Sequence, residues 1–231
     1  MAVRTVIDRG PKAKRSVAFA LDWPGWSRGA KTVEVALETL ESYRVRYQPV
    51  AALAEMTGEF DAAGPIEIVE DKVGTPSTDF WAISFAPSST ELDPMANDEL
   101  ERGITLLRAC WTFFDALAAR VSPELQKGPR GGGRDRDAII RHVFRVESLD
   151  FAKHVGLDIP DGPILAGDAL QRYREDYVAG MHAYNTGQFE RRMKKWTLPF
   201  LIRHSAFHTL DHAWEMQDKD LSGRAQAGIA P

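Results

Sequence analysis

The sequence predicts an α+β protein in which a small α+β domain (residues 1–93) is followed by an up-and-down bundle of four helices (residues 94–231). Two observations carry this prediction. Short β-type runs separated by proline and glycine turns occupy the first part, whereas after Pro94 the apolar residues recur at helical spacing. The 231 residues, 44% of them hydrophobic, suffice for the core of one large or two small domains.

The N-terminal part is expected to combine short strands with one helix. Thr32 has a side chain suited to a helix N-cap, and apolar residues follow it at helical spacing over residues 33–56. Turn residues, such as the Pro24-Gly25 pair, separate the β-type runs. The expected strands are residues 3–7, 16–21, 66–69 and 80–85.

The C-terminal part is expected to contain four helices with modest loops, which is typical of an up-and-down bundle. Asn97 and Thr197 are suited to cap the first and the last of them. Residues 127–134, rich in glycine and arginine, favour a flexible link; a contact of Arg130 and Arg134 with an anionic substrate is the less favoured alternative. The expected helices are residues 98–121, 135–155, 167–185 and 198–220.

Three of the six histidines fall within the last expected helix. Residues four apart lie on the same face of a helix, so His208 and His212 can bind one ion, and so can His204 and His208. His142, on the second expected helix, can supply a third ligand because its apolar helical neighbours place it on the core-facing side. Hydrogen-bonded core histidines are the alternative interpretation.

These two helices resemble the DinB-like (DinB/YfiT) superfamily of metal-binding four-helix bundles, through IIRHVFRVE at residues 139–147 and RHSAFHTLDHAWE at residues 203–215. The resemblance covers residues 94–221. It implies that His142, His208 and His212 bind a divalent ion, zinc or nickel. It also implies that His204 does not bind the ion, and either has no part in the site or contacts the ligands. The activities it implies are metal-dependent transfer of a mycothiol- or bacillithiol-type thiol, or hydrolysis.

Three histidine ligands leave a coordination position open, as in catalytic rather than structural zinc sites. Metal-bound histidines usually donate their other ring N–H to an acceptor, and Asp211 and Glu215 both flank the histidine pair. The sequence leaves open which of the two orients an imidazole, or whether both face solvent. Glu147 lies off the face of His142 and is interpreted as structural.

The N-terminal part supplies a second hypothesis. Its sequence VAFALDWPGWSRGAKT, residues 17–32, resembles the HicB-type α+β fold of antitoxins, in which such a domain binds a protein partner. The resemblance implies a non-enzymatic interaction protein whose N-terminal domain binds a partner or mediates oligomerisation.

Composition limits the partners and the location. The net charge of -4 and the pI near 5.9 argue against a nucleic-acid partner. Cys110 is the single cysteine and lies in an apolar run, so neither a disulfide within the chain nor a cysteine-built zinc site is expected. No apolar run has the length of a membrane span. We expect a cytoplasmic protein whose partners are a small-molecule thiol or other substrate and, in a homodimer, a second copy of the chain.

Overall fold

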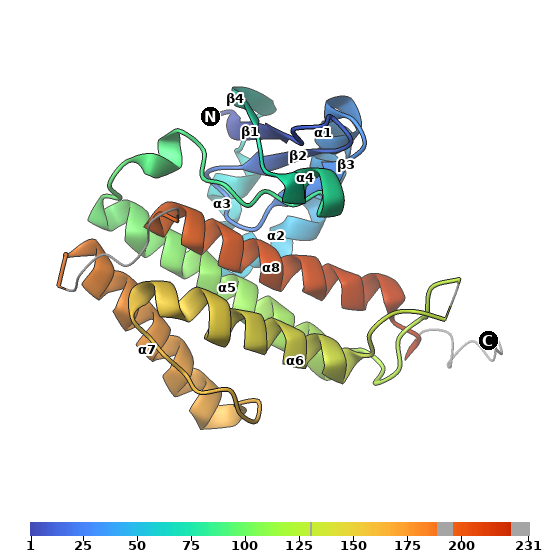
Figure 1. The fold of residues 1–231 in the computed structure, drawn as a ribbon, viewed down its shortest axis with the longest axis vertical. Helices are drawn as coiled ribbons and strands as arrows, with labels where there is room; N and C mark the ends of the chain where they lie inside the picture. The colour runs from blue at the N-terminus through green and yellow to red at the C-terminus, as the bar shows by residue number, and fades with distance from the viewer. Residues whose placement is uncertain (130, 189–195, 223–231) are drawn as a thin grey trace.

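The computed structural model describes residues 1–129, 131–188 and 196–222. Over these residues the chain has an α+β fold: a sheet of four strands lies in the first part, and long helices follow it (Figure 1). None of the described helices is long and apolar enough to cross a membrane.

The sheet has the strand order β3-β2-β1-β4. Strand β1 pairs antiparallel with β2 and parallel with β4, and β2 pairs antiparallel with β3. A parallel pair needs a crossover connection, and the chain from β1 to β4 runs through β2 and β3 and then through three helices. The strands are β1 (Val3–Arg9), β2 (Ser16–Ala20), β3 (Ser27–Ala30) and β4 (Ile66–Val73), and the crossover helices are α1 (Val33–Ser42), α2 (Arg44–Leu53) and α3 (Thr57–Asp61).

The helix expected over residues 33–56 is divided at Tyr43, which ends α1 and precedes α2. The division follows from packing, because the Tyr43 ring contacts Trp214 of the last helix while Tyr47 stacks on Trp26. Strand β3 was not expected. Its sequence, Ser-Arg-Gly-Ala, has no β-type pattern, and pairing with β2 determines its conformation.

The prediction of a strand over residues 80–85 is wrong, because the first residues of this segment belong to helix α4 (Pro76–Trp81). Pro76 lies in the first turn of α4, where a fixed φ favours a helix. The Asp79 carboxylate accepts hydrogen bonds from the backbone N–H groups of Lys12 and Lys14 in the β1–β2 turn, which attaches α4 to the hairpin. An irregular segment and the 3-10 turn η1 (Thr90–Leu92) follow.

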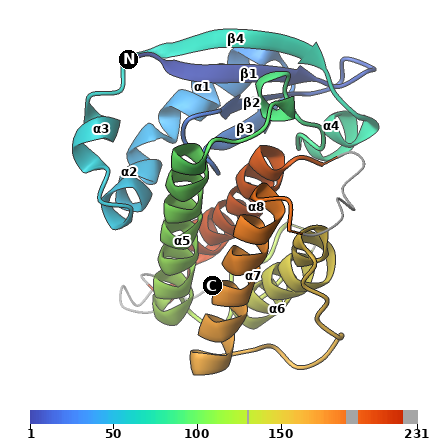
Figure 2. The ribbon, with the colours of Figure 1, turned by 90° about the vertical axis from the view of Figure 1, so that its left-hand side faces the viewer.

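A long helix forms in each of the four C-terminal regions where the sequence predicts one, although the second is a regular α-helix only as far as Val146. The four helices are α5 (Asn97–Arg120), α6 (Arg136–Val146), α7 (Gly167–Asn185) and α8 (Leu198–Lys219). The sheet and its crossover helices lie on the side formed by α5 and α8, and α6 and α7 lie beyond them (Figures 1 and 2). Helices α6 and α8 are neighbours and run in opposite directions (Figure 1).

The second long helix changes type before it ends. After α6 the chain continues as a π-helical segment, η2 (Glu147–Phe151), and a 3-10 turn, η3 (Ala152–Val155). Gly156 then adopts a φ of 83°, the left-handed conformation that ends helices and favours glycine. The expected end of this helical region is therefore confirmed, whereas its regular α-helical geometry is not.

Most buried apolar side chains of both parts belong to one continuous cluster, and Val6, Val17 and Phe19 of the sheet form a second, small one. The Pro24-Gly25 turn, expected from the sequence, lies directly against α8. Gly25 has a φ of 93°, and a Cβ there would lie 2.7 Å from Leu210 Cδ1 and 3.1 Å from the Ala206 carbonyl oxygen. Cys110 is fully buried in the same cluster, as expected, and burial raises the pKa of its thiol.

Replacing Gly25 with alanine is expected to lower the free energy of unfolding by about 2–4 kcal/mol, because the new Cβ is strained by the positive φ and collides with Leu210. Chemical unfolding of the purified variant measures this loss. Gly58→Ala is the control, since a Cβ at Gly58 in α3 meets nothing within 4 Å. Equal stability of the two variants would contradict the close approach of this turn to α8.

Candidate metal centre

The structure brings together the three histidines that the sequence selects. His142 lies on α6, and His208 and His212 lie one turn apart on α8, which runs alongside. One ring nitrogen from each of the three lies within 4.8 Å of the other two, and each residue is partly buried. The Nε2 atoms of His142 and His208 are 3.2 Å apart. In the described residues no other group of three histidine, cysteine or carboxylate side chains is arranged in this way.

This arrangement fits a divalent ion with nitrogen ligands. Two nitrogens that each bind a tetrahedral zinc at about 2.0–2.1 Å lie about 3.3 Å apart, close to the observed separation of the two Nε2 atoms. The His212 ring is inclined by 88° to His142 and by 84° to His208, so the rings approach from different directions. The Nε2 atoms of His142 and His208 are also within hydrogen-bond distance of each other, and the third ring, His212, contacts Glu215 through its Nδ1.

The electrostatics of the site favour neutral imidazoles, the form that binds metal ions. Burial, and then the neighbouring His212, lower the pKa of His142 to about 4. The same two causes hold the pKa of His208 well below its usual value. Arg134 adds a smaller effect in the same direction on both residues. Both side chains are therefore unprotonated near pH 7 and have ring nitrogens available as ligands.

Glu215 is the acid that orients a histidine. Its Oε2 lies 2.8 Å from His212 Nδ1, and its Oε1 accepts a hydrogen bond from Lys219 Nζ at 2.6 Å. The bond with His212 is the main reason that the pKa of Glu215 is lowered to about 2. Asp211, the other candidate, instead pairs with Arg28 of β3 at 2.8 Å.

His204 lies one turn before His208 and is not part of the group. It is 2% exposed, and its Nδ1 has no hydrogen-bond partner among the described residues. Burial, and then the charge of Arg203, lower its pKa to about 3. Aromatic rings surround it, those of Phe85, Phe151, Trp196 and Phe200. Its surroundings are those of a neutral core residue.

The sequence did not show that the aromatic ring of Phe151 lies close to the histidines. The Phe151 ring of η2 has its centroid 5.6 Å from that of His208, and it also contacts His204. In the sequence Phe151 was only one apolar position of the second helix. Its approach to His208 depends on the π-helical geometry that precedes it, which no sequence pattern indicated.

Glu147 is structural in the sense the sequence suggested, but it is deeply buried. Its Oε2 accepts a hydrogen bond from Trp111 Nε1 at 2.6 Å. Burial raises the pKa of its carboxyl group to about 7. This side chain connects η2 to α5, on a different side of the helix from His142.

Comparison with protein-family models, curated proteins and solved structures finds no match to this chain. The DinB-like and HicB-type resemblances therefore depend on the two sets of motifs alone. A function has to be inferred from the chemistry of the histidine site.

Glu147→Gln is expected to change how stability depends on pH. The pKa of the Glu147 carboxyl group is near 7 in the folded protein and about 4.5 in the unfolded chain. Between these two values the folded protein binds one proton more than the unfolded chain, so the free energy of unfolding falls as the pH rises from about 4.5 through 7. Above pH 8 this decrease in the free energy of unfolding reaches about 3 kcal/mol. Glutamine still accepts the Trp111 hydrogen bond but does not ionise.

The free energy of unfolding of both proteins, measured in urea from pH 5 to pH 9, checks this. The variant should be the more stable protein at pH 8, and the difference should shrink towards pH 5. Parallel pH profiles would show that Glu147 does not titrate in this range.

Proposed function

We propose that this protein binds one zinc or nickel ion through His142, His208 and His212, and that its C-terminal part is a DinB-like four-helix bundle. The observation that supports the proposal is the convergence of three ring nitrogens from two neighbouring helices within 4.8 Å of one another. Their burial keeps two of the imidazoles neutral, as metal binding requires.

The proposed activity is transfer of a low-molecular-weight thiol, or hydrolysis. A divalent ion with an open coordination position lowers the pKa of a bound water or thiol and so supplies a nucleophile near neutral pH. The residues of the chain position the ligands and limit water. Glu215 fixes the ring orientation of His212, and Phe151 covers one side of His208.

A second candidate function is partner binding by the N-terminal, HicB-like part. The observation that favours it is an exposed apolar pair on α4, Phe80 and Trp81, which are 72% and 59% exposed and contact each other. Exposed aromatic residues of this kind are enriched in protein interfaces. A partner bound there would remain bound when the histidines are replaced, which separates this function from the metal site.

Purified protein is expected to contain about one zinc or nickel ion per chain, and His142→Ala and His208→Ala are each expected to lose it. Elemental analysis after exhaustive dialysis measures the content, and thermal melts with added Zn²⁺ or Ni²⁺ measure the stabilisation. His204→Phe is the matched control, because it changes a histidine on the same helix that lies outside the group. Metal uptake that survives His142→Ala would contradict the proposed ligand set.

Glu215→Gln is expected to weaken metal binding by about 10- to 100-fold, because the acceptor that orients His212 is changed. Competition with a chelator of known affinity measures the dissociation constant. Asp211→Asn is the control: it alters the other acid beside the pair, and its expected effect is on the contact with Arg28. If Asp211→Asn lowers the affinity for the metal ion as much as Glu215→Gln does, then a general disturbance of α8, and not the orientation of His212, determines metal binding.

A further inference from the structure

A cavity of about 260 Å³ lies between the sheet and the long helices. The first turns of α5 and α8 line it, together with β1, the turn after β2 and the segment around η1. On α8 the lining residues are Pro199, Ile202 and Arg203, and on an α-helix Arg203 and His208 point about 140° away from each other. The cavity is therefore separate from the histidine group. Small-molecule sites are often found at such a junction between two parts of a protein.

The charges that line this cavity do not balance. Each of its three arginines is paired with an acid. The pairs are Arg4–Asp22, Arg102–Glu59 and Arg203–Glu91. Asp93 and Glu99 also line the cavity, and neither forms an ion pair within the described part of the chain; Glu99 only accepts a hydrogen bond, from the Ala96 N–H at 2.9 Å. No lysine or histidine of the described residues lines the cavity, so these two carboxylates favour a cationic group on a ligand.

A buried guanidinium in the same lining has an N–H group to spare. Arg203 is 4% exposed, its Nε and Nη2 atoms donate to Glu91, and Nη2 also donates to the Ala86 carbonyl oxygen. No acceptor among the described residues bonds its Nη1. Pro199, in the first turn of α8, lines the cavity as well, so the positive end of this helix lies there. Both features favour a negatively charged acceptor, such as a carboxylate, on the ligand.

Apolar side chains make up much of the remaining lining. Leu106 of α5 and Ile202 of α8 are 0% and 1% exposed, and Leu21 adds to the same surface. Burial of an apolar group against them is favourable. The volume of the cavity limits the ligand to a small molecule, and its lining favours one with an apolar body.

We propose that this cavity binds a free α-amino acid with an apolar side chain. Its ammonium group pairs with Asp93 and Glu99, and its carboxylate accepts a hydrogen bond from Arg203 Nη1. Its side chain lies against Leu106 and Ile202. A single small molecule with one positive charge, one negative charge and an apolar body thus matches the three features of the lining.

Leucine and two of its fragments test the proposal on the full chain. Isoamylamine lacks the carboxylate of leucine, and isocaproate lacks the ammonium group. Isothermal titration calorimetry measures the three dissociation constants, and leucine is expected to bind more tightly than either fragment. The protein is kept free of metal, because amino acids themselves bind zinc and nickel.

Asp93→Asn and Glu99→Gln are each expected to weaken leucine binding about fivefold, the effect of one exposed charge pair. Both are expected to leave isocaproate binding unchanged, since that compound has no cationic group. The two side chains are exposed, and glutamine still accepts the hydrogen bond from the Ala96 N–H, so both variants should fold.

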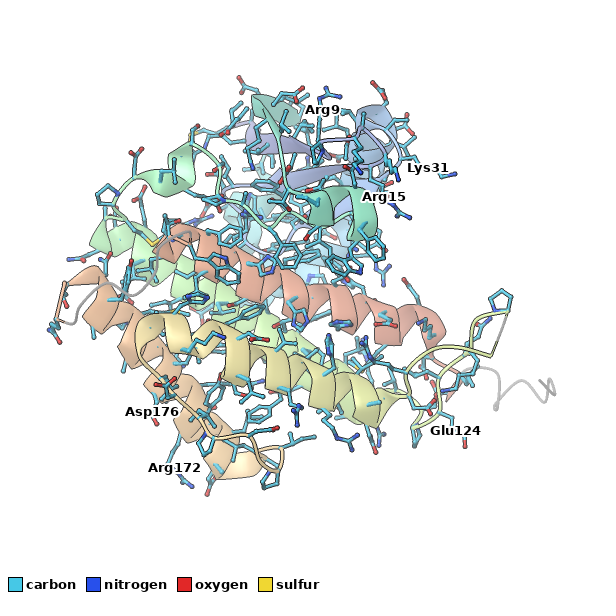
Figure 3. The ribbon with its side chains drawn as sticks, viewed as in Figure 1. Arg9, Arg15, Lys31, Glu124, Arg172 and Asp176 are labelled. Atoms are coloured by element: carbon cyan, nitrogen blue, oxygen red, sulfur yellow. The ribbon has the colours of Figure 1, made fainter. Side chains whose placement is uncertain are left out.

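Asp176→Asn is the matched control, because Asp176 is an exposed acid on α7, on the side of the bundle away from the sheet (Figure 3). It should bind leucine as the unchanged protein does. The proposal is overturned if leucine does not bind at about 10 mM, or if either fragment binds as tightly as leucine. It is also overturned if Asp93→Asn and Asp176→Asn weaken leucine binding equally.

Discussion

Helix α8 is enclosed by the rest of the molecule, and the candidate site depends on that enclosure. Near its beginning, the buried Arg203 pairs with Glu91 and lies over the Phe19 ring of β2 at 3.8 Å. Further along, Arg28 of β3 pairs with Asp211 and lies over the rings of Tyr43 and Trp214. Such contacts on several sides fix the rotation of α8 about its axis. His208 and His212 therefore face α6, the neighbour that carries the third histidine.

Helix α6 and the segment η2 that follows it are fixed by contacts with α5 and α7. Glu147 binds Trp111 of α5, and Phe144 contacts Tyr173 of α7. The contact with Trp111 buries the carboxyl group of Glu147, and burial makes its charged form unfavourable. Two helices fixed independently hold three imidazoles close together, so an ion bound by them would cost little ordering entropy.

The sequence could predict the features of the site that depend on the geometry of a single helix, but not those that depend on contacts between distant parts of the chain. The spacing of His208 and His212 is a property of any α-helix, and the apolar neighbours of His142 were enough to place it on a buried face. The choice of Glu215 over Asp211 could not be made, because it depends on Arg28, which is far away in the sequence. The division of the helix at Tyr43 likewise comes from ring contacts across the molecule, which outweigh local preference.

The π-helical segment η2 has a consequence for the shape of the site. His142 and Phe151 are nine positions apart, and on a regular α-helix they would point about 180° away from each other. A wider turn rotates the chain less per residue, so the stretch between them falls out of phase with an α-helix. Both rings can then lie close to His208, at centroid distances of 5.0 and 5.6 Å. One continuous stretch of chain thus presents both an imidazole ring and an aromatic ring to the same neighbour, a pairing that an ideal helix would place on opposite sides.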